Sequence, residues 1–235
     1  MELTAERLLS LGPVVPVLTL ESADDAVPVA QALVDGGLRA IEVTLRTSAA
    51  PAAIERIAEN VPDAVVGAGT VLSQRDAKLA RRAGARFLVA PGSTQRLLEV
   101  LESSGLPFLA GVSTPSEVLR LVERGIFSAK LFPAEAAGGV ALLRALHGPF
   151  PGVRFCPTGG ITEALASTYL ELPNVACVGG SWMCTPAMIN ARDWASIQSC
   201  AEASAALGAA PRPEGASGDR KPQPACDNEH VPWSQ

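Results

Sequence analysis

The chain of 235 residues has few of the side chains that bind metals or form disulfides. Neither of its two histidines, His147 and His230, has metal-ligand spacing around it, so we expect no histidine metal site and no Ser-His-Asp triad. The five cysteines are odd in number and form no CxxC pair, which favours small buried thiols in a reducing compartment over disulfides or zinc ligands. These cysteines are Cys156, Cys177, Cys184, Cys200 and Cys226.

Long apolar runs and dense basic runs are also missing. No stretch of about 18 apolar residues suggests a membrane span, and the opening MELTAERLLS is acidic, without the apolar core of a secretory signal. A net charge of −5 with no lysine or arginine cluster argues against nucleic-acid binding. We therefore expect a cytoplasmic protein with no membrane or nucleic-acid partner. An anionic small molecule remains possible as a ligand, because backbone amides bind anions locally.

The chain does have a repeated pattern. Eight short apolar runs, their centres about 20 to 26 residues apart, alternate with segments of helical period. Such alternation predicts a parallel sheet, and eight units in this length fit an α/β fold, a single (β/α)8 TIM barrel. A doubly wound open sheet is the alternative, but its G-x-G-x-x-G turn is absent after the first run, which continues LTLESADD. The predicted strands are residues 14–20, 40–45, 64–70, 86–91, 107–113, 126–132, 153–158 and 175–179.

The two ends of the chain differ from this pattern. The segment LTAERLLS precedes the first strand, and we expect it to form a helix that caps the bottom of the barrel. From about residue 209 the sequence is rich in proline, glycine and charge, with no periodicity. We predict a barrel domain over residues 1–208 and a disordered tail over residues 209–235.

One lysine stands inside a run that otherwise resembles a buried strand, FSAKLF. An isolated buried ammonium is costly, so Lys130 either belongs to a structural ion pair or takes part in chemistry. Alternation along the strand directs Ala129 and Leu131 toward the outer helices. It directs Ser128, Lys130 and Phe132 into the barrel.

The same alternation in AIEVTLR places Glu42, Thr44 and Arg46 inward, because the other side chains of the run are apolar. Thr70 and Thr158 fall at the carboxyl ends of their predicted strands, where the active sites of such barrels lie. Five polar residues should therefore converge on one mouth of the barrel. They are Glu42, Arg46, Thr70, Lys130 and Thr158.

Glycine pairs follow the last two predicted strands. Gly159-Gly160 and Gly179-Gly180 stand where barrels of this kind commonly bind phosphate. Glycine lets backbone N–H groups approach an anion closely, whereas a pair that serves only as a tight turn needs no ligand. Two pairs at these two places favour a phosphate site.

Six segments together resemble the KDPG (2-dehydro-3-deoxy-phosphogluconate) aldolase family, class I Schiff-base enzymes of the Entner–Doudoroff pathway that are closely related to the KHG (4-hydroxy-2-oxoglutarate) aldolases. The likeness spans roughly residues 8–207. One departure is Ala137, where the family has asparagine in AEANGG. The segments are GGLRAIEVTLRT, VGAGTVL, VAPG, AKLFPAEAAGG, VRFCPTGGI and VGGSW.

The resemblance implies a role for each matching residue. Lys130 would be the Schiff-base lysine and Glu42 the general acid and base. Arg46 and Thr70 would bind the carboxylate of the pyruvyl half, and Thr158 would bear on the stereochemistry accepted at C4. The remaining implied contacts are Pro91, lining the pocket, and Gly159, Gly160, Gly180 and Ser181, holding the phosphate.

The resemblance also implies the reaction, a reversible cleavage of KDPG to pyruvate and glyceraldehyde 3-phosphate. Cleavage of KHG to pyruvate and glyoxylate would use the same residues. No metal or organic cofactor is implied, since an iminium on Lys130 provides the electron sink. The free amine is the nucleophile, and at the ordinary lysine pKa of about 10.4 only about one lysine in 2,500 is neutral at pH 7. The family is usually homotrimeric.

Three other interpretations stay open at this point. The chain could prefer the C4 epimer, 2-dehydro-3-deoxy-6-phosphogalactonate. It could be a phosphosugar enzyme of the same fold in which Lys130 acts only through its charge. It could also bind a phosphosugar without catalysis, which would require the glycine loops but not the pairing of Lys130 with Glu42.

Overall fold

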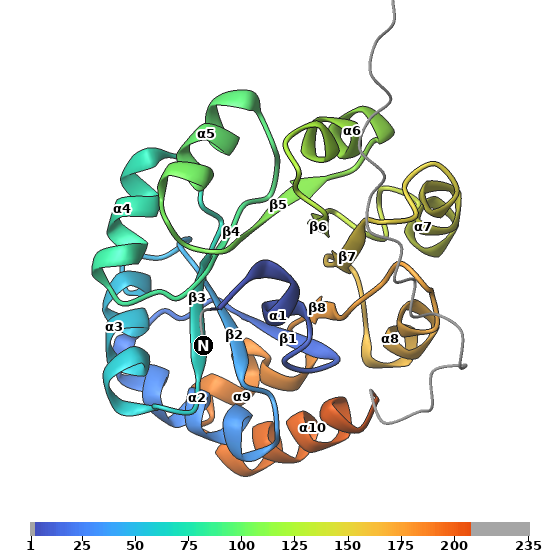
Figure 1. Cartoon of the computed structure of the whole chain (residues 1–235). Helices are drawn as coiled ribbons and strands as arrows, with labels where there is room; N and C mark the ends of the chain where they lie inside the picture. The colour runs from blue at the N-terminus through green and yellow to red at the C-terminus, as the bar shows by residue number, and fades with distance from the viewer. Residues whose placement is uncertain (1–2, 208–235) are drawn as a thin grey trace, which may run out of the picture.

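The computed structural model describes residues 3–207, which form eight parallel strands inside a ring of helices (Figure 1). The strands are hydrogen-bonded in the order β7-β6-β5-β4-β3-β2-β1-β8, and two isolated bridges join β7 to the segment around β8. The predicted TIM barrel is therefore confirmed, nearly closed. The strands are β1 Val14–Leu18, β2 Ala40–Thr44, β3 Val65–Gly69, β4 Leu88–Val89, β5 Phe108–Val112, β6 Ser128–Leu131, β7 Arg154–Pro157 and β8 Val178–Gly180.

Helices follow the strands around the outside of the barrel. The helices and 3-10 turns (η) are α1 Ala5–Leu9, η1 Ala23–Asp25, α2 Ala26–Asp35, α3 Ala50–Asn60, α4 Gln74–Arg82, α5 Gln95–Ser103, α6 Pro115–Glu123, α7 Gly139–His147, α8 Glu163–Leu170, η2 Trp182–Cys184, α9 Pro186–Asn190 and α10 Trp194–Ala206. Helix α6 shows how the sequence sets the limits of a helix. Thr114 and Glu117 form a capping box at its start. Gly125, with φ of +73°, follows its end.

The last predicted strand begins three residues later than expected. The bridges pair Phe155 with Val175 and Thr158 with Gly179, so three residue steps along the β7 segment match four along the segment that leads into β8. The extra residue interrupts regular pairing as a bulge does, and β8 starts only at Val178. Strand β4 is also shorter than predicted, with only Leu88 and Val89 in regular pairing.

Alternation along the strands separates two apolar clusters. Ile41, Val43 and Leu131 belong to the larger one, between the sheet and the helices. A smaller cluster fills the interior of the barrel, and Leu8 and Leu9 of α1 belong to it. Helix α1 thus closes the amino-terminal end of the barrel, as predicted for a capping helix (Figure 1).

Two expectations concern the limits of the chain. The tail predicted over residues 209–235, with Cys226 and His230, lies outside the described residues. Within residues 3–207, no helix is both long enough and apolar enough to cross a membrane.

Candidate active site

Lys130 and Glu42 meet inside the barrel, 88 residues apart in the sequence. The Lys130 Nζ donates to Glu42 Oε1 at 3.2 Å and to Oε2 at 3.4 Å. Both residues are buried, with exposed fractions of 5% and 4%. The ring of Phe132 lies 5.4 Å from the Nζ, close enough for a cation–π contact. The inward direction predicted for Lys130 and Glu42 is confirmed.

A glycine makes room for this pair. Gly69, on the neighbouring strand β3, pairs in register with Thr44. A Cβ built on Gly69 would overlap the carboxylate of Glu42. The absence of a side chain at this one position lets the Glu42 carboxylate lie against the β3 backbone.

Arg46 and Thr70 are the second pair at the same end of the barrel. The Arg46 Nε donates to Thr70 Oγ1 at 3.1 Å, and Arg46 is otherwise exposed. Thr70 has φ of +59°, in the left-handed region that costs a non-glycine residue roughly 1–3 kcal/mol. The surrounding structure therefore holds Thr70 in a costly conformation, as is common for residues that contact ligands.

The two glycine segments lie on adjacent strands. The bridge between Thr158 and Gly179 brings Gly159-Gly160 beside Gly180-Ser181. Gly159 and Gly160 have φ of +105° and +80°, a backbone that a side chain would strain. Thr158 is buried at the entrance to this loop, and a Cβ on Gly179 would overlap its hydroxyl.

Pro91 lies at the same end, in the segment after β4. A Cβ on Gly111 of β5 would overlap the carbonyl group of Pro91. Of the residues predicted for the mouth, Arg46, Thr70 and Thr158 follow the ends of their strands. Lys130 is the next-to-last residue of β6, and Glu42 lies in the middle of β2.

Comparison with known proteins gives this arrangement a family. The sequence profile described as KDPG and KHG aldolase matches residues 5–200. The chain is 45% identical over 201 residues to a 2-dehydro-3-deoxy-phosphogluconate aldolase of Pseudoalteromonas atlantica, covering 86% of this chain and 94% of the relative. It is 47% identical over 194 residues to a KHG/KDPG aldolase of Escherichia coli, covering 83% and 91%.

The chain belongs to the KDPG and KHG aldolase family. A solved KDPG aldolase of Legionella pneumophila, with pyruvate captured as a covalent carbinolamine intermediate, is 41% identical with a TM-score of 0.84, covering 86% of this chain and 98% of the other. A Zymomonas mobilis relative solved with 3-phosphoglycerate is 42% identical with a TM-score of 0.82, covering 86% and 95%.

Some residues near the aldolase site were not singled out by the sequence patterns. Thr44 was placed inward but given no role; its Oγ1 bonds to the Leu18 carbonyl at 3.0 Å and to Thr19 Oγ1 at 2.9 Å. Thr44 therefore ties β2 to β1 beside Glu42. The alternation in AIEVTLR predicts that Thr44 points inward, but it does not predict these hydrogen bonds.

Cys156 is the register neighbour of Lys130 on β7 and is buried. A hydrogen bond with the Cys177 thiol is the main cause that lowers the Cys156 pKa; burial opposes it, and the charge of Lys130 adds to it. The expectation of buried thiols holds for both cysteines. That the two thiols meet near Lys130 was not foreseen, because residues 176 and 177 lie in the irregular stretch before β8.

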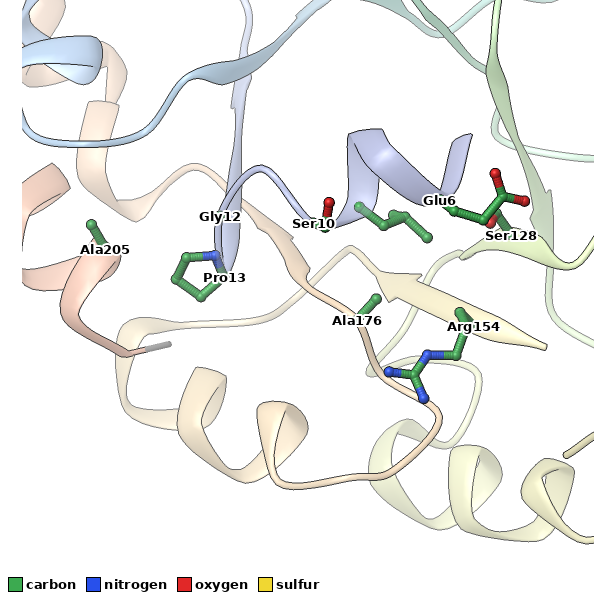
Figure 2. A pocket seen from close by; sticks show the side chains of 9 residues that line it. Glu6, Ser10, Gly12, Pro13, Ser128, Arg154, Ala176 and Ala205 are labelled. Atoms are coloured by element: carbon green, nitrogen blue, oxygen red, sulfur yellow. The ribbon is translucent and has the colours of Figure 1, made fainter. Parts of the chain in front are cut away.

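The opposite end of the aldolase barrel holds a cavity of about 500 Å³ (Figure 2). It is lined by residues of α1, of the segment between α1 and β1 and of the amino-terminal ends of strands, including Glu6, Ser10, Gly12, Ser128 and Arg154. None of the predicted site residues lines it. Within the described part of the chain, no three His, Cys, Asp or Glu residues gather closely enough to hold a metal ion.

Proposed function

We propose that Lys130 cleaves KDPG into pyruvate and glyceraldehyde 3-phosphate through a Schiff base, with Glu42 moving the protons. The observation that carries this proposal is the buried contact of 3.2 Å between the two side chains. The covalent pyruvate carbinolamine in the Legionella pneumophila relative supports it, because that adduct precedes an iminium.

The reaction begins when the neutral Lys130 amine attacks the C2 carbonyl carbon of the substrate. Glu42 protonates the departing hydroxyl of the carbinolamine, and water leaves as the iminium forms. Glu42 then accepts the proton of the C4 hydroxyl. The C3–C4 bond breaks, and its electron pair passes through C3 and C2 to the iminium nitrogen, forming an enamine.

Glyceraldehyde 3-phosphate leaves at this stage. The enamine is protonated at C3, and water hydrolyses the resulting iminium to release pyruvate and the free Lys130 amine. The iminium accepts the electrons throughout, so the reaction needs no metal or organic cofactor.

Arg46 and Thr70 hold the substrate carboxylate in this proposal. A guanidinium can bind a carboxylate through two parallel hydrogen bonds, which fixes the C2 carbonyl for attack. Two observations support a preformed carboxylate site: Arg46 donates to Thr70, and the Thr70 backbone is in the left-handed region. Pro91 lines the same pocket.

Gly159, Gly160, Gly180 and Ser181 bind the phosphate, and Thr158 contacts the substrate near C4. The adjacency of the two glycine segments supports this assignment. The 3-phosphoglycerate in the Zymomonas mobilis relative carries a carboxylate and a phosphate, the same two anionic groups that the proposed substrate presents.

A second substrate, KHG, is favoured by the relative from Escherichia coli, which is named for both activities. KHG has no phosphate and would rely on Lys130, Glu42 and the carboxylate site of Arg46 and Thr70. We therefore expect slower cleavage of KHG than of KDPG, measured as kcat/KM.

The decisive experiment traps the iminium. Borohydride added with pyruvate should reduce it to a stable secondary amine, giving one adduct per chain on Lys130. Mapping is simple, because the chain has only three lysines, Lys78, Lys130 and Lys221. Lys130→Arg keeps the charge but should give no adduct and no turnover, whereas Lys78→Arg, on the exposed surface of α4, should retain both. Turnover by Lys130→Arg would favour an enzyme in which this residue acts only through its charge.

Two further proposals concern the whole molecule. Residues 1–208 form the catalytic unit, and residues 209–235 are not needed for turnover; a chain truncated after residue 208 should retain kcat/KM. The chain works in the cytoplasm as a homotrimer, and light scattering should give three chain masses.

A further inference from the structure

The loop between β6 and α7 is fastened to the proposed phosphate loop through its backbone. The Ala134 N–H donates to the Thr158 carbonyl at 2.8 Å, and the Glu135 N–H donates to the Gly159 carbonyl at 3.1 Å. The first glycine segment therefore takes its position from the loop that follows the Schiff-base strand, as well as from its own strand β7.

A side-chain contact lies directly over this junction. The hydroxyl of Tyr169, on α8, donates to Glu135 Oε1. The Tyr169 ring is fully buried, whereas Glu135 is exposed. A Cβ on Gly160 would lie 2.8 Å from the Glu135 Cβ and 2.9 Å from its Cγ, so the Glu135 side chain covers Gly160.

The same contact reaches the start of α7. A Cβ on Gly139 would lie 2.8 Å from the Tyr169 hydroxyl and 2.9 Å from Glu135 Oε1. The hydrogen bond joins the loop after β6 to α8, and its two side chains pack against Gly160 of the loop after β7 and Gly139 of α7. Burial is the main cause that raises the Tyr169 pKa, and the hydrogen bond to Glu135 and its negative charge add to it, so the hydroxyl keeps its proton at neutral pH.

Because Glu135 is negatively charged, the side to which its carboxylate points affects the binding of an anionic substrate. A carboxylate that covers Gly160 could turn toward the backbone N–H groups meant for an anionic substrate and repel its phosphate. The bond to Tyr169 holds Oε1 on the side of α8. The mechanism has no step for either residue.

We propose that Tyr169 and Glu135 are positioning residues, whose hydrogen bond keeps the Gly159-Gly160 backbone in the shape that receives the substrate phosphate and keeps the Glu135 carboxylate out of that site. This inference rests on the proposed function, since it presumes that these glycines bind phosphate. Its consequence is selective: losing the bond should weaken the use of phosphorylated substrate and spare unphosphorylated substrate.

The test compares kcat/KM for KDPG and KHG in each variant. In Tyr169→Phe, which keeps the ring and removes the donor, the KDPG value should fall about three- to tenfold through KM, while the KHG value stays within twofold. In Glu135→Gln, the amide oxygen still accepts from Tyr169. The ratio of kcat/KM for KDPG to that for KHG should therefore stay near the wild-type ratio. If Tyr169→Phe fails to fold, Glu135→Ala cuts the same bond from the exposed side; it should lower the ratio less than Tyr169→Phe would, because the repelling carboxylate is lost with the bond.

A structural control and a spectroscopic measurement complete the test. Ser104→Ala removes a buried hydroxyl bond to the Leu101 carbonyl on α5 and should lower Tm without changing the substrate ratio. Tyr169 is the only tyrosine, so the ultraviolet tyrosinate signal reports on it alone. Its apparent pKa should fall in Glu135→Gln, because the negative charge is lost.

The outcomes separate the two proposals. A wild-type enzyme that forms no borohydride adduct, or that prefers KHG to KDPG, contradicts the proposed function, and the positioning role with it. The positioning role alone is overturned by a different result. In that case the wild-type enzyme prefers KDPG, but in Tyr169→Phe and Glu135→Ala kcat/KM falls equally for both substrates or changes for neither.

Discussion

The two ends of the barrel differ in which side chains they hold and in how those side chains are paired. At the carboxyl end, Lys130 contacts Glu42 and Arg46 contacts Thr70. At the amino end, Leu8 and Leu9 fill the interior, and the buried Ser128 Oγ has no hydrogen-bond partner among the described residues. The cavity of about 500 Å³ is nevertheless at the amino end. The two ends therefore differ in kind: polar side chains converge at the carboxyl end, and an open volume lies at the amino end.

Replacing a carboxylate at each end is the strongest way to test this contrast. Glu42→Gln should lower kcat by about 10²- to 10⁴-fold, because the amide cannot exchange protons with the substrate. Glu6→Gln, on α1 beside the amino-end cavity, should leave kcat within twofold. Steady-state kinetics with KDPG check both, and a large loss in Glu6→Gln would mean that the amino end takes part in catalysis.

A methyl group added to a glycine at each end should give the next largest effect. In Gly69→Ala, the new Cβ must displace the Glu42 carboxylate, and we expect a loss of roughly 10- to 100-fold in kcat and about 1–3 kcal/mol of stability. In Gly12→Ala the nearest heavy atom is the Val14 carbonyl oxygen, 3.9 Å from the new Cβ, so activity and Tm should be retained. Equal behaviour of the two variants, followed by kinetics and thermal unfolding, would contradict the close fit around Glu42.

Shortening an arginine at each end should have a moderate effect. Arg46→Lys keeps the charge but loses the planar pair of donors, so KM for KDPG should rise about tenfold with a smaller change in kcat. The matched Arg7→Lys, on α1, should leave KM unchanged. A fall in kcat with constant KM in Arg46→Lys would assign Arg46 to the transition state and not to carboxylate binding.

The smallest effect is expected at Ser128. Removing an unpartnered buried hydroxyl is neutral or stabilising, so Ser128→Ala should leave the free energy of unfolding unchanged or raise it by up to about 1 kcal/mol. The control Ser104→Ala removes the hydrogen bond of 2.6 Å from the Ser104 hydroxyl to the Leu101 carbonyl. It should lower the free energy of unfolding by about 1 kcal/mol. Denaturant unfolding distinguishes them, and a greater loss in Ser128→Ala would show that the amino-end hydroxyl has a partner in solution.

Much of the fold and the central pair followed from local patterns. Alternation along FSAKLF and AIEVTLR was enough to direct Lys130 and Glu42 into one interior, because a barrel strand has only two faces. The eight strand-helix units followed from the spacing of apolar runs. Such inferences need only short-range periodicity and the geometry of a closed sheet.

The remaining features depend on contacts that no local pattern encodes. The need for glycine at position 69 comes from a side chain on the neighbouring strand. The left-handed backbone of Thr70 is unfavourable for threonine in isolation, so intrinsic preference would not predict it. Tyr169 resembled any apolar helix residue until its partner, 34 residues away, was known.

The closure of the barrel by Leu8 and Leu9 has a kinetic consequence. Because the amino end is filled, substrates of the proposed reaction reach Lys130 from the carboxyl end. In the proposed reaction the three-carbon fragment stays bonded to Lys130, between the closed amino end and the mouth, so the aldehyde must depart first. In the direction of synthesis pyruvate must bind before the aldehyde, and an aldehyde that arrives early should act as an inhibitor competing for the same passage.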